Sequence, residues 1–81
     1  MRNEQSHNTK YYKNFIQIGL NIMRYRKESG LSQEELAAQT GYSRNQIQRV
    51  ETAVSAPSLA MLYEISEALS VPMEKLLRLD L

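Results

Sequence analysis

The side chains best suited to chemistry lie together in residues 43–52, SRNQIQRVET. This stretch holds two arginines and three amide side chains, and it has no acidic residue before Glu51. Arginine can bind guanine O6 and N7 with two hydrogen bonds, and Asn or Gln can bind adenine N6 and N7 similarly. The lack of an acid before Glu51 also avoids electrostatic repulsion by phosphate. The stretch is therefore equipped to hydrogen-bond flat, planar groups such as the edges of base pairs.

Residues that could carry out catalysis or bind a metal are scarce. The chain has no Cys, and its one His, His7, lies in a polar N-terminal segment, so the usual nucleophile–base pairs are missing. Glycine occurs only at positions 19, 30 and 41, which excludes a phosphate-cradling glycine-rich loop. Glu34 and Glu35 are adjacent and point in different directions on a helix. We therefore expect no enzyme activity, no metal site, no cofactor and no small-molecule ligand.

Two helix starts of the same kind position the polar stretch. Ser32 and Glu35 have the spacing of a capping box, in which each side chain bonds the backbone N–H of the other residue, and Ser43 and Gln46 repeat it. Gly41 lies between them, where a left-handed turn favours a residue without a side chain. The starts lie eleven residues apart. The sequence therefore predicts two short helices joined by a tight turn, which is the helix-turn-helix pattern.

Apolar residues at helical spacing predict three further helices. One runs from about Asn14 to a stop at Gly30, and its apolar stripe is Phe15, Ile18, Ile22 and Met23. After a loop at 52–57, Ser58 caps another, whose apolar residues are Leu59, Leu62, Ile65 and Leu69. Pro72 begins the last, which carries Met73, Leu76, Leu77, Leu79 and Leu81. There is no strand signal, so we expect an all-α fold, a five-helix bundle.

The bulk composition indicates one small intracellular domain. Of the 81 residues, 42% are hydrophobic and 23% are charged, as in ordinary soluble proteins. We expect residues 1–12 to form a flexible polar segment and residues 13–81 the domain. The lack of Cys, of a membrane-length apolar run and of a secretory signal favours the cytoplasm.

The charges are unevenly distributed along the chain. Residues 1–50 hold eight Lys or Arg and four acids, whereas residues 51–81 hold two Lys or Arg and five acids. One end of the molecule could therefore face a polyanion.

About three quarters of the chain resembles the XRE-like family of helix-turn-helix DNA-binding domains, the Cro and phage-repressor type. The matching residues run from Ile18 to Leu77 and include IGLNIMRYRKESGLSQEELAAQTGYSRNQIQRVE and PSLAMLYEISEALSVPMEKLL. The resemblance implies a five-helix bundle of the phage-repressor type with its motif at about residues 33–52. It also implies binding to double-stranded operator DNA as a symmetric dimer, with the third helix in the major groove.

The resemblance further implies a role for each matching residue. Base reading falls to Arg44, Asn45, Gln48 and Arg49. Contact with DNA phosphates falls to Gln33, Ser43, Gln46 and Thr52. Arg26 and Glu51 match a structural ion pair that ties the first helix to the end of the third.

The loop TAVSAP, residues 52–57, departs from the family pattern. Ala53 stands where the family usually has Gly, and Val54 and Ser55 stand where basic residues that bind phosphate are common. We therefore expect weaker DNA binding than is usual, or compensation by Arg2, Lys10 and Lys13. Further along the chain, Ser70 replaces a common Gly and Pro72 replaces a common Ser cap.

The C-terminal apolar residues predict contact with a second copy. Some of the set closes the core of the monomer, and the remainder predicts a homodimer interface drawn from Met73, Leu76, Leu77, Leu79 and Leu81. An alternative is a protein-interaction module on the same fold, which would bind a partner such as a toxin. The length suits a free-standing regulator of a phage, a plasmid, a restriction–modification operon or a toxin–antitoxin pair, and the residues do not choose among these.

Overall fold

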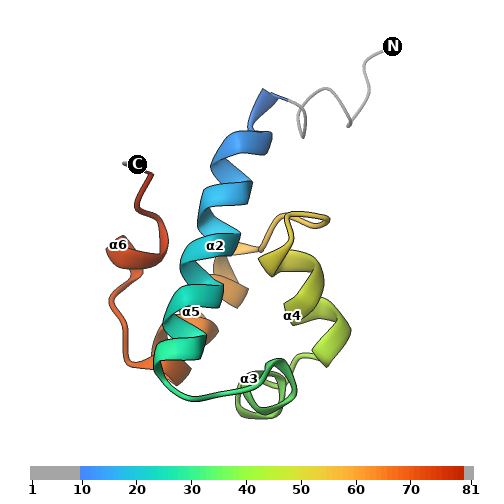
Figure 1. Ribbon diagram of the computed structural model, residues 1–81, viewed down its shortest axis with the longest axis vertical. Helices are drawn as coiled ribbons and strands as arrows, with labels where there is room; N and C mark the ends of the chain where they lie inside the picture. Colours follow the sequence, from blue (N-terminus) through green and yellow to red (C-terminus); the bar gives the residue numbers. More distant parts are fainter. Residues whose placement is uncertain (1–9, 80–81) are drawn as a thin grey trace.

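The computed structural model describes residues 10–79, which form five helices and no strand (Figure 1). The helices are α2 (Tyr12–Glu28), α3 (Gln33–Thr40), α4 (Arg44–Glu51), α5 (Leu59–Leu69) and α6 (Met73–Leu76). The expected all-α, five-helix fold is confirmed. The first helix begins at Tyr12, slightly earlier than its apolar stripe indicated. The expectation of a flexible segment falls mainly on residues 1–9, which lie outside the described residues.

Both predicted capping boxes are present. The Ser32 hydroxyl accepts from the Glu35 N–H at 3.0 Å, and the Glu35 carboxylate accepts from the Ser32 N–H at 2.8 Å. Ser43 and Gln46 exchange the same two hydrogen bonds at 3.1 and 2.8 Å. Gly41, with φ 82°, closes α3 in the left-handed conformation. These local interactions fix both the start of α4 and the turn that leads into it.

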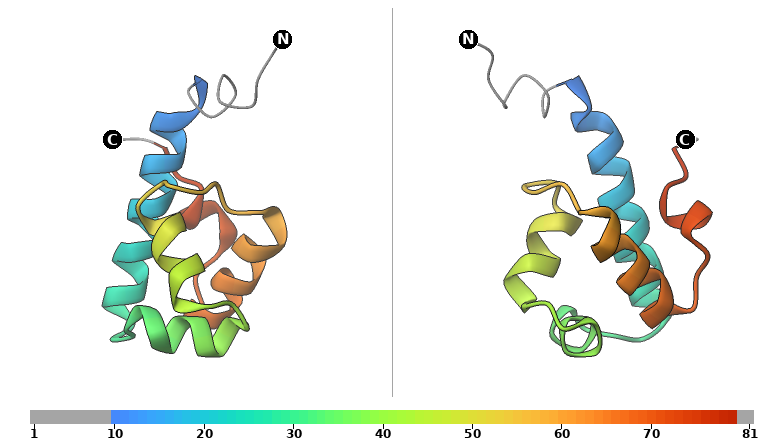
Figure 2. Two further views of the ribbon diagram at one scale, coloured as in Figure 1. Left: turned by 90° about the vertical axis from the view of Figure 1, so that its right-hand side faces the viewer. Right: turned by 180° about the vertical axis from the view of Figure 1, so that it is seen from behind.

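All five helices contribute to one core. α2 is the longest and stands between α4 on one side and α6 on the other, while α3 closes the end of the bundle (Figures 1 and 2). The most deeply buried side chains come one from each helix: Ile22, Leu36, Ile47, Ile65 and Leu76. Other buried apolar residues surround them: Ile18, Ala37, Val50, Met61, Leu62 and Leu69. α4 is therefore held against the bundle by the same core that holds every other helix.

The C-terminal segment departs from expectation, because α6 ends at Leu76 and is only four residues long. Leu77 and Leu79 lie beyond it, and Leu81 lies outside the described residues. The buried side chain of Asn21 donates to the carbonyl oxygens of Leu76 (2.9 Å) and Arg78 (2.8 Å). A side chain of α2 therefore occupies backbone acceptors that a longer helix would use for its own hydrogen bonds.

Two turns place ordinary residues in the left-handed conformation that glycine adopts most easily. Ala53 has φ 63° and Ser70 has φ 55°. Both are positions where the family that the sequence resembles commonly has glycine. Because a side chain in this conformation crowds the following carbonyl, each residue costs about 1 kcal/mol. Both turns therefore form without the residue that suits them best.

Candidate nucleic-acid interface

The outward face of α4 is polar along its whole length. Ile47 and Val50 face the core and are 0% and 4% exposed. Since successive residues of a helix are rotated by about 100°, the side facing away from these two carries Asn45, Gln48, Arg49 and Thr52. All four are exposed. In Figures 1 and 2, this side of α4 has no other helix over it.

The first turn of α4 adds three further polar side chains. Ser43, Arg44 and Gln46 are all exposed. Gln46 uses its carbonyl oxygen in the capping box, which leaves its amide N–H groups available to an acceptor. Ser43 accepts through its oxygen, so its hydroxyl proton can still be donated. The start of α4 therefore combines a guanidinium, an amide and a hydroxyl on one exposed turn.

A buried ion pair fixes the far end of α4. Arg26 and Glu51, the expected pair, meet through two hydrogen bonds: Nε to Oε2 at 2.6 Å and Nη2 to Oε1 at 3.0 Å. Their side chains are 9% and 1% exposed. Arg26 Nη1 also donates to the carbonyl oxygen of Leu31 at 2.8 Å. One guanidinium on α2 thus holds the last residue of α4 and the segment entering α3.

Gln33, the first residue of α3, joins the same network. Its amide Nε2 donates to Glu51 Oε1 at 2.9 Å, and the residue is half-buried. The carboxylate of Glu51 therefore receives hydrogen bonds from both α2 and α3. One N–H of the Gln33 amide is used internally, and the second is left to meet an acceptor at the start of α3.

Sequence reasoning missed Gly19, which sets the distance between α2 and α4. A Cβ atom at this position would lie 2.6 Å from the carbonyl oxygen of Val50 and 2.7 Å from that of Glu51. The two backbones therefore approach too closely for any side chain. The available signal was a glycine inside a strongly periodic helix, which is costly there and usually has a packing reason.

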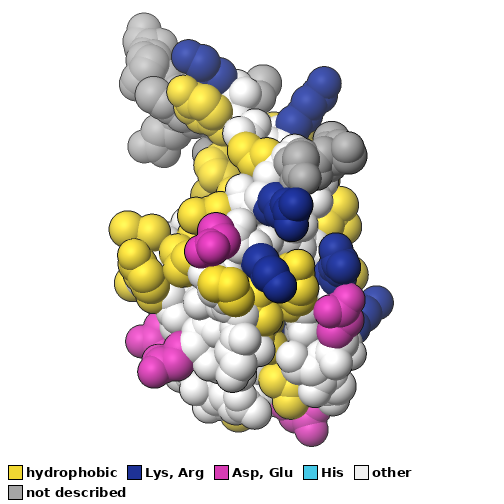
Figure 3. All heavy atoms as spheres, turned by 90° about the vertical axis from the view of Figure 1, so that its left-hand side faces the viewer, with side chains coloured by type: hydrophobic (Ala, Val, Ile, Leu, Met, Phe, Trp, Pro, Cys, Tyr) yellow, Lys and Arg dark blue, Asp and Glu magenta, His cyan; other side chains and the backbone are white. Residues whose placement is uncertain are grey.

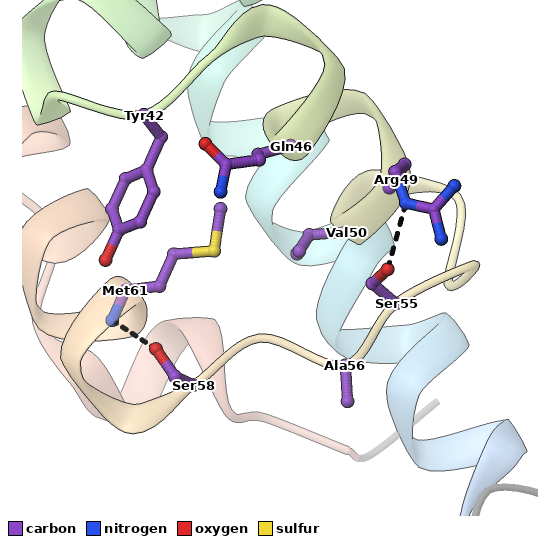
Figure 4. Close-up of a pocket in the computed structure, with 8 residues that line it drawn as sticks. All are labelled: Tyr42, Gln46, Arg49, Val50, Ser55, Ala56, Ser58 and Met61. Carbon is purple, nitrogen blue, oxygen red and sulfur yellow. Dashed lines mark hydrogen bonds between the residues drawn. The ribbon is translucent and has the colours of Figure 1, made fainter.

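The loop after α4 engages α4 itself. The Ser55 hydroxyl accepts from Arg49 Nε at 3.1 Å, as Figure 4 shows. The Thr52 hydroxyl donates to the carbonyl oxygen of Gln48 at 2.9 Å, so its proton points along the helix. A pocket of about 210 Å³ lies between α4, this loop and the start of α5, with Tyr42 and Met61 at one side and Arg49 at the other (Figure 4).

A second cationic region lies on the face away from α4. Figure 3 shows Lys and Arg side chains gathered on the face of the molecule where α6 packs against α2. A polar pocket of about 180 Å³ there is lined by Arg24, Lys75 and Arg78, among others. Arg24 comes from the basic half of the sequence, and the other two come from the acidic half. The basic residues 1–50 and the acidic residues 51–81 therefore do not form a basic face and an acidic face of the molecule.

Only part of the expected dimer set is exposed. Leu76 is fully buried in the core of its own chain, so it has no surface to offer a partner. Met73 is half-buried and packs against the same core. Leu77 and Leu79 remain, at 39% and 44% exposed. Leu76 is therefore not available to the expected dimer interface, because the short α6 packs its side chain into the core of the monomer.

The helices of residues 10–79 include none that is long and apolar enough to cross a membrane. The same part of the chain brings together no group of three His, Asp or Glu side chains that could hold a metal ion.

Comparison with known proteins decides the family. A family model described as helix-turn-helix matches residues 22–76. The chain belongs to the XRE-like helix-turn-helix family. The match spans α3, α4, α5, α6 and the end of α2 from Ile22 onward, so the expected resemblance is confirmed. In this helix-turn-helix chain, the first helix of the motif is α3 and the second is α4.

Two curated relatives are similar to this helix-turn-helix chain. An uncharacterized HTH-type transcriptional regulator of Sinorhizobium fredii is 39% identical over 54 residues, which is 67% of this chain and 70% of the relative. Another, from Methanothermobacter thermautotrophicus, is 44% identical over 48 residues, 59% of this chain and 70% of the relative. Neither name states a DNA target.

Two solved structures share the fold. The restriction-modification controller protein C.AhdI of Aeromonas hydrophila has a TM-score of 0.79 and 29% identity, covering 82% of this chain and 96% of that one. The hypothetical transcription factor NHTF from Neisseria has a TM-score of 0.77 and 31% identity, covering 80% of this chain and 75% of that one.

Proposed function

We propose that the protein is a sequence-specific transcriptional regulator that binds double-stranded DNA with α4 in the major groove. The observation that carries this proposal is the division of α4 into two faces. Ile47, Val50 and Glu51 fix one face to the bundle, and the other exposes only guanidinium, amide and hydroxyl groups. Such groups match the donor and acceptor pattern of base edges. The transcriptional regulators similar to this chain support the same function.

The individual roles follow from position on α4. Arg44 and Asn45 lie in the first turn, the part of a recognition helix that contacts base edges, and Gln48 and Arg49 continue the same surface. Phosphates would meet the N–H and O–H groups that Gln33, Ser43 and Gln46 leave available at the margins. Thr52 would join them once its hydroxyl turns away from the carbonyl oxygen of Gln48. The N-termini of α3 and α4 add partial positive charge toward the DNA backbone.

A homodimer on a palindromic operator completes the proposal. One recognition helix reads only a few base pairs, and a twofold axis doubles the contacts and mirrors them in the site. Leu77 and Leu79 support the dimer because they remain exposed after α6 has packed. Leu81 belongs to the same proposed surface and lies outside the described residues.

A DNA target together with a chain free of cysteine suits the cytoplasm.

Selection of bound duplexes from a random pool, at two salt concentrations, tests the proposal. We expect an enriched palindrome whose half-site separation is about one helical turn or a multiple of it. The variant Arg44→Ala/Arg49→Ala should lose the enrichment while its far-ultraviolet circular dichroism is unchanged. Arg24→Ala/Lys75→Ala is the matched control, because it removes the same charge from the opposite face and should keep the palindrome. Equal enrichment by both double variants would refute the role of α4.

A protein-binding role is the second candidate, and one observation favours it. Leu59 and Tyr63 lie one turn apart on α5 and are 62% and 59% exposed. Large apolar side chains of this kind anchor protein interfaces. A folded protein that enriches no DNA sequence, but binds a co-purifying protein only while Leu59 and Tyr63 are intact, would establish this role and exclude the first.

A further inference from the structure

The loop at residues 52–57 is tied to one residue of α4. The carbonyl oxygen of Arg49 accepts from the N–H groups of Val54 (2.8 Å) and Ser55 (3.1 Å). The side chain of Arg49 donates through Nε to the Ser55 hydroxyl at 3.1 Å. The left-handed turn at Ala53 brings the chain back far enough for these contacts. Backbone and side chain of Arg49 are thus both held by the same loop.

This contact limits how the guanidinium can be used. The N–H donors of Arg lie in one fixed plane. A guanine can be bound by the two terminal nitrogens, or from the side by Nε together with one terminal nitrogen. Nε of Arg49 is already directed at Ser55, whereas both terminal nitrogens point away from the pocket in Figure 4. Only the end-on arrangement is open without breaking the bond to Ser55.

We propose that Ser55 is a positioning residue that presents Arg49 end-on to a base, so that the loop contributes sequence discrimination where related loops contribute phosphate binding. The proposal rests on the proposed function, because it assigns a geometry to one of the base-reading residues.

Conformational entropy gives the arrangement its effect. A free arginine side chain samples many rotamers, and fixing it on binding opposes association. Arg49 is exposed, so packing does not restrict it, and the Ser55 hydroxyl is the restraint. A pre-ordered fork loses less freedom when it meets two acceptors in one plane. A flexible side chain could instead reach several bases or a phosphate, which would lower the discrimination among base pairs at the position that Arg49 reads.

Three substitutions separate positioning from charge. Ser55→Ala removes the hydroxyl and keeps the charge of Arg49, Ser55→Thr keeps a hydroxyl at the same position, and Arg49→Ala identifies the base pair that Arg49 reads. Ser70→Ala is the matched control. It removes a second serine hydroxyl that also follows a helix. Ser70 is exposed, has no hydrogen bond to Arg49 and lies at the far end of α5.

The readout is base preference at each operator position, measured by competition among single-base variants of the selected site. Ser55→Ala should lower discrimination about fivefold or more at the pair identified by Arg49→Ala, and at no other pair. Ser55→Thr and Ser70→Ala should match the wild type. The salt dependence of Ser55→Ala should be unchanged, because no cation is lost. If Ser55→Ala keeps the wild-type preference while Arg49→Ala loses it, Ser55 does not position Arg49.

A measurement on the free protein keeps the inference testable if the wild type selects no DNA sequence. In the wild type, the Nε–H of Arg49 should give a nuclear magnetic resonance signal that exchanges slowly with water and is displaced from those of exposed arginines. Ser55→Ala should return it to their range. A wild-type signal already in that range would overturn the hydrogen bond itself, independently of whether the protein reads DNA.

Discussion

Glu51 is the residue through which three helices meet behind the proposed reading surface. Its carboxylate receives hydrogen bonds from Arg26 on α2 and from Gln33 on α3, while the residue itself ends α4. The group is almost fully buried. A buried ion pair contributes little net stability when it replaces apolar packing, but losing one partner leaves an uncompensated charge. The pair therefore fixes the relative placement of the helices.

Glu51→Gln should lower the free energy of unfolding by about 3 kcal/mol, because Arg26 would remain buried without its counter-charge. Urea denaturation followed by circular dichroism measures the change. Glu28→Gln is the control, since it breaks the exposed ion pair with Arg24 and should shift the midpoint very little. If the two variants lose equal free energy of unfolding, the buried ion pair contributes no more to stability than the exposed one.

Ala53→Gly should raise the free energy of unfolding by about 0.5–1 kcal/mol, because glycine accepts the positive φ of this position without strain. Thermal or urea denaturation measures the gain. Ala56→Gly is the matched control in the same loop. Its φ is not positive, so added chain entropy should make it neutral or destabilising. A loss of stability in Ala53→Gly as large as in the control would contradict the strain argument.

At the scale of helices, the position of α4 against α2 depends on the absence of a side chain at Gly19. Gly19→Ala would place Cβ less than 3 Å from two backbone carbonyl oxygens, so α2 and α4 must separate. We expect a loss of about 1–3 kcal/mol in stability, despite the better helix propensity of alanine. DNA affinity should fall in titrations at temperatures where the variant is fully folded, because α4 is displaced.

Asn14→Ala is the control for this substitution, since it puts alanine at an exposed position of the same helix. It should retain both stability and DNA affinity. A Gly19→Ala variant that binds DNA as tightly as Asn14→Ala would show that the spacing between α2 and α4 does not govern recognition.

The elements predictable from sequence are those fixed by neighbours in the chain. The capping boxes of α3 and α4 join residues three apart, and the turn at Gly41 needs only its own backbone conformation, so all were readable. The contacts of Asn21 and Gly19 were not predictable, although a glycine inside a periodic helix does indicate a packing role of some kind. Asn21 bonds carbonyl groups 55 and 57 residues away, and Gly19 faces the end of α4. The same long-range contact ended α6 early, against the longer helix that its apolar residues predicted.

The residues of the candidate site also divide into those that the sequence predicts and those that depend on the folded chain. The resemblance placed the polar residues of α4 in order, and helical periodicity made their outward direction predictable. The use of Ser55 was not predictable, because the loop differs from the family where family members carry basic residues. A missing cation was visible in the sequence, whereas a hydrogen bond to Arg49 required the folded loop.

At the scale of the whole molecule, the exposed C-terminal leucines bear on assembly. Leu77→Ser/Leu79→Ser should convert a dimer to a monomer in sedimentation at tens of micromolar, a concentration at which a specific interface holds. The fold should be retained, since both side chains are already partly exposed. Leu59→Ser/Tyr63→Ser is the matched control on α5. Unchanged sedimentation of the first variant and dissociation of the control would move the interface to α5.

The two strained turns at Ala53 and Ser70 have a consequence for how long each molecule persists. A domain of this size has little stability to spare, and about 1 kcal/mol changes its unfolded fraction about fivefold. Proteases that cut the transiently opened chain act in proportion to that fraction. Short-lived copies follow the current rate of their own synthesis closely. With glycine absent from both turns, a regulator of this kind would be degraded sooner, and its level would follow its own synthesis more closely.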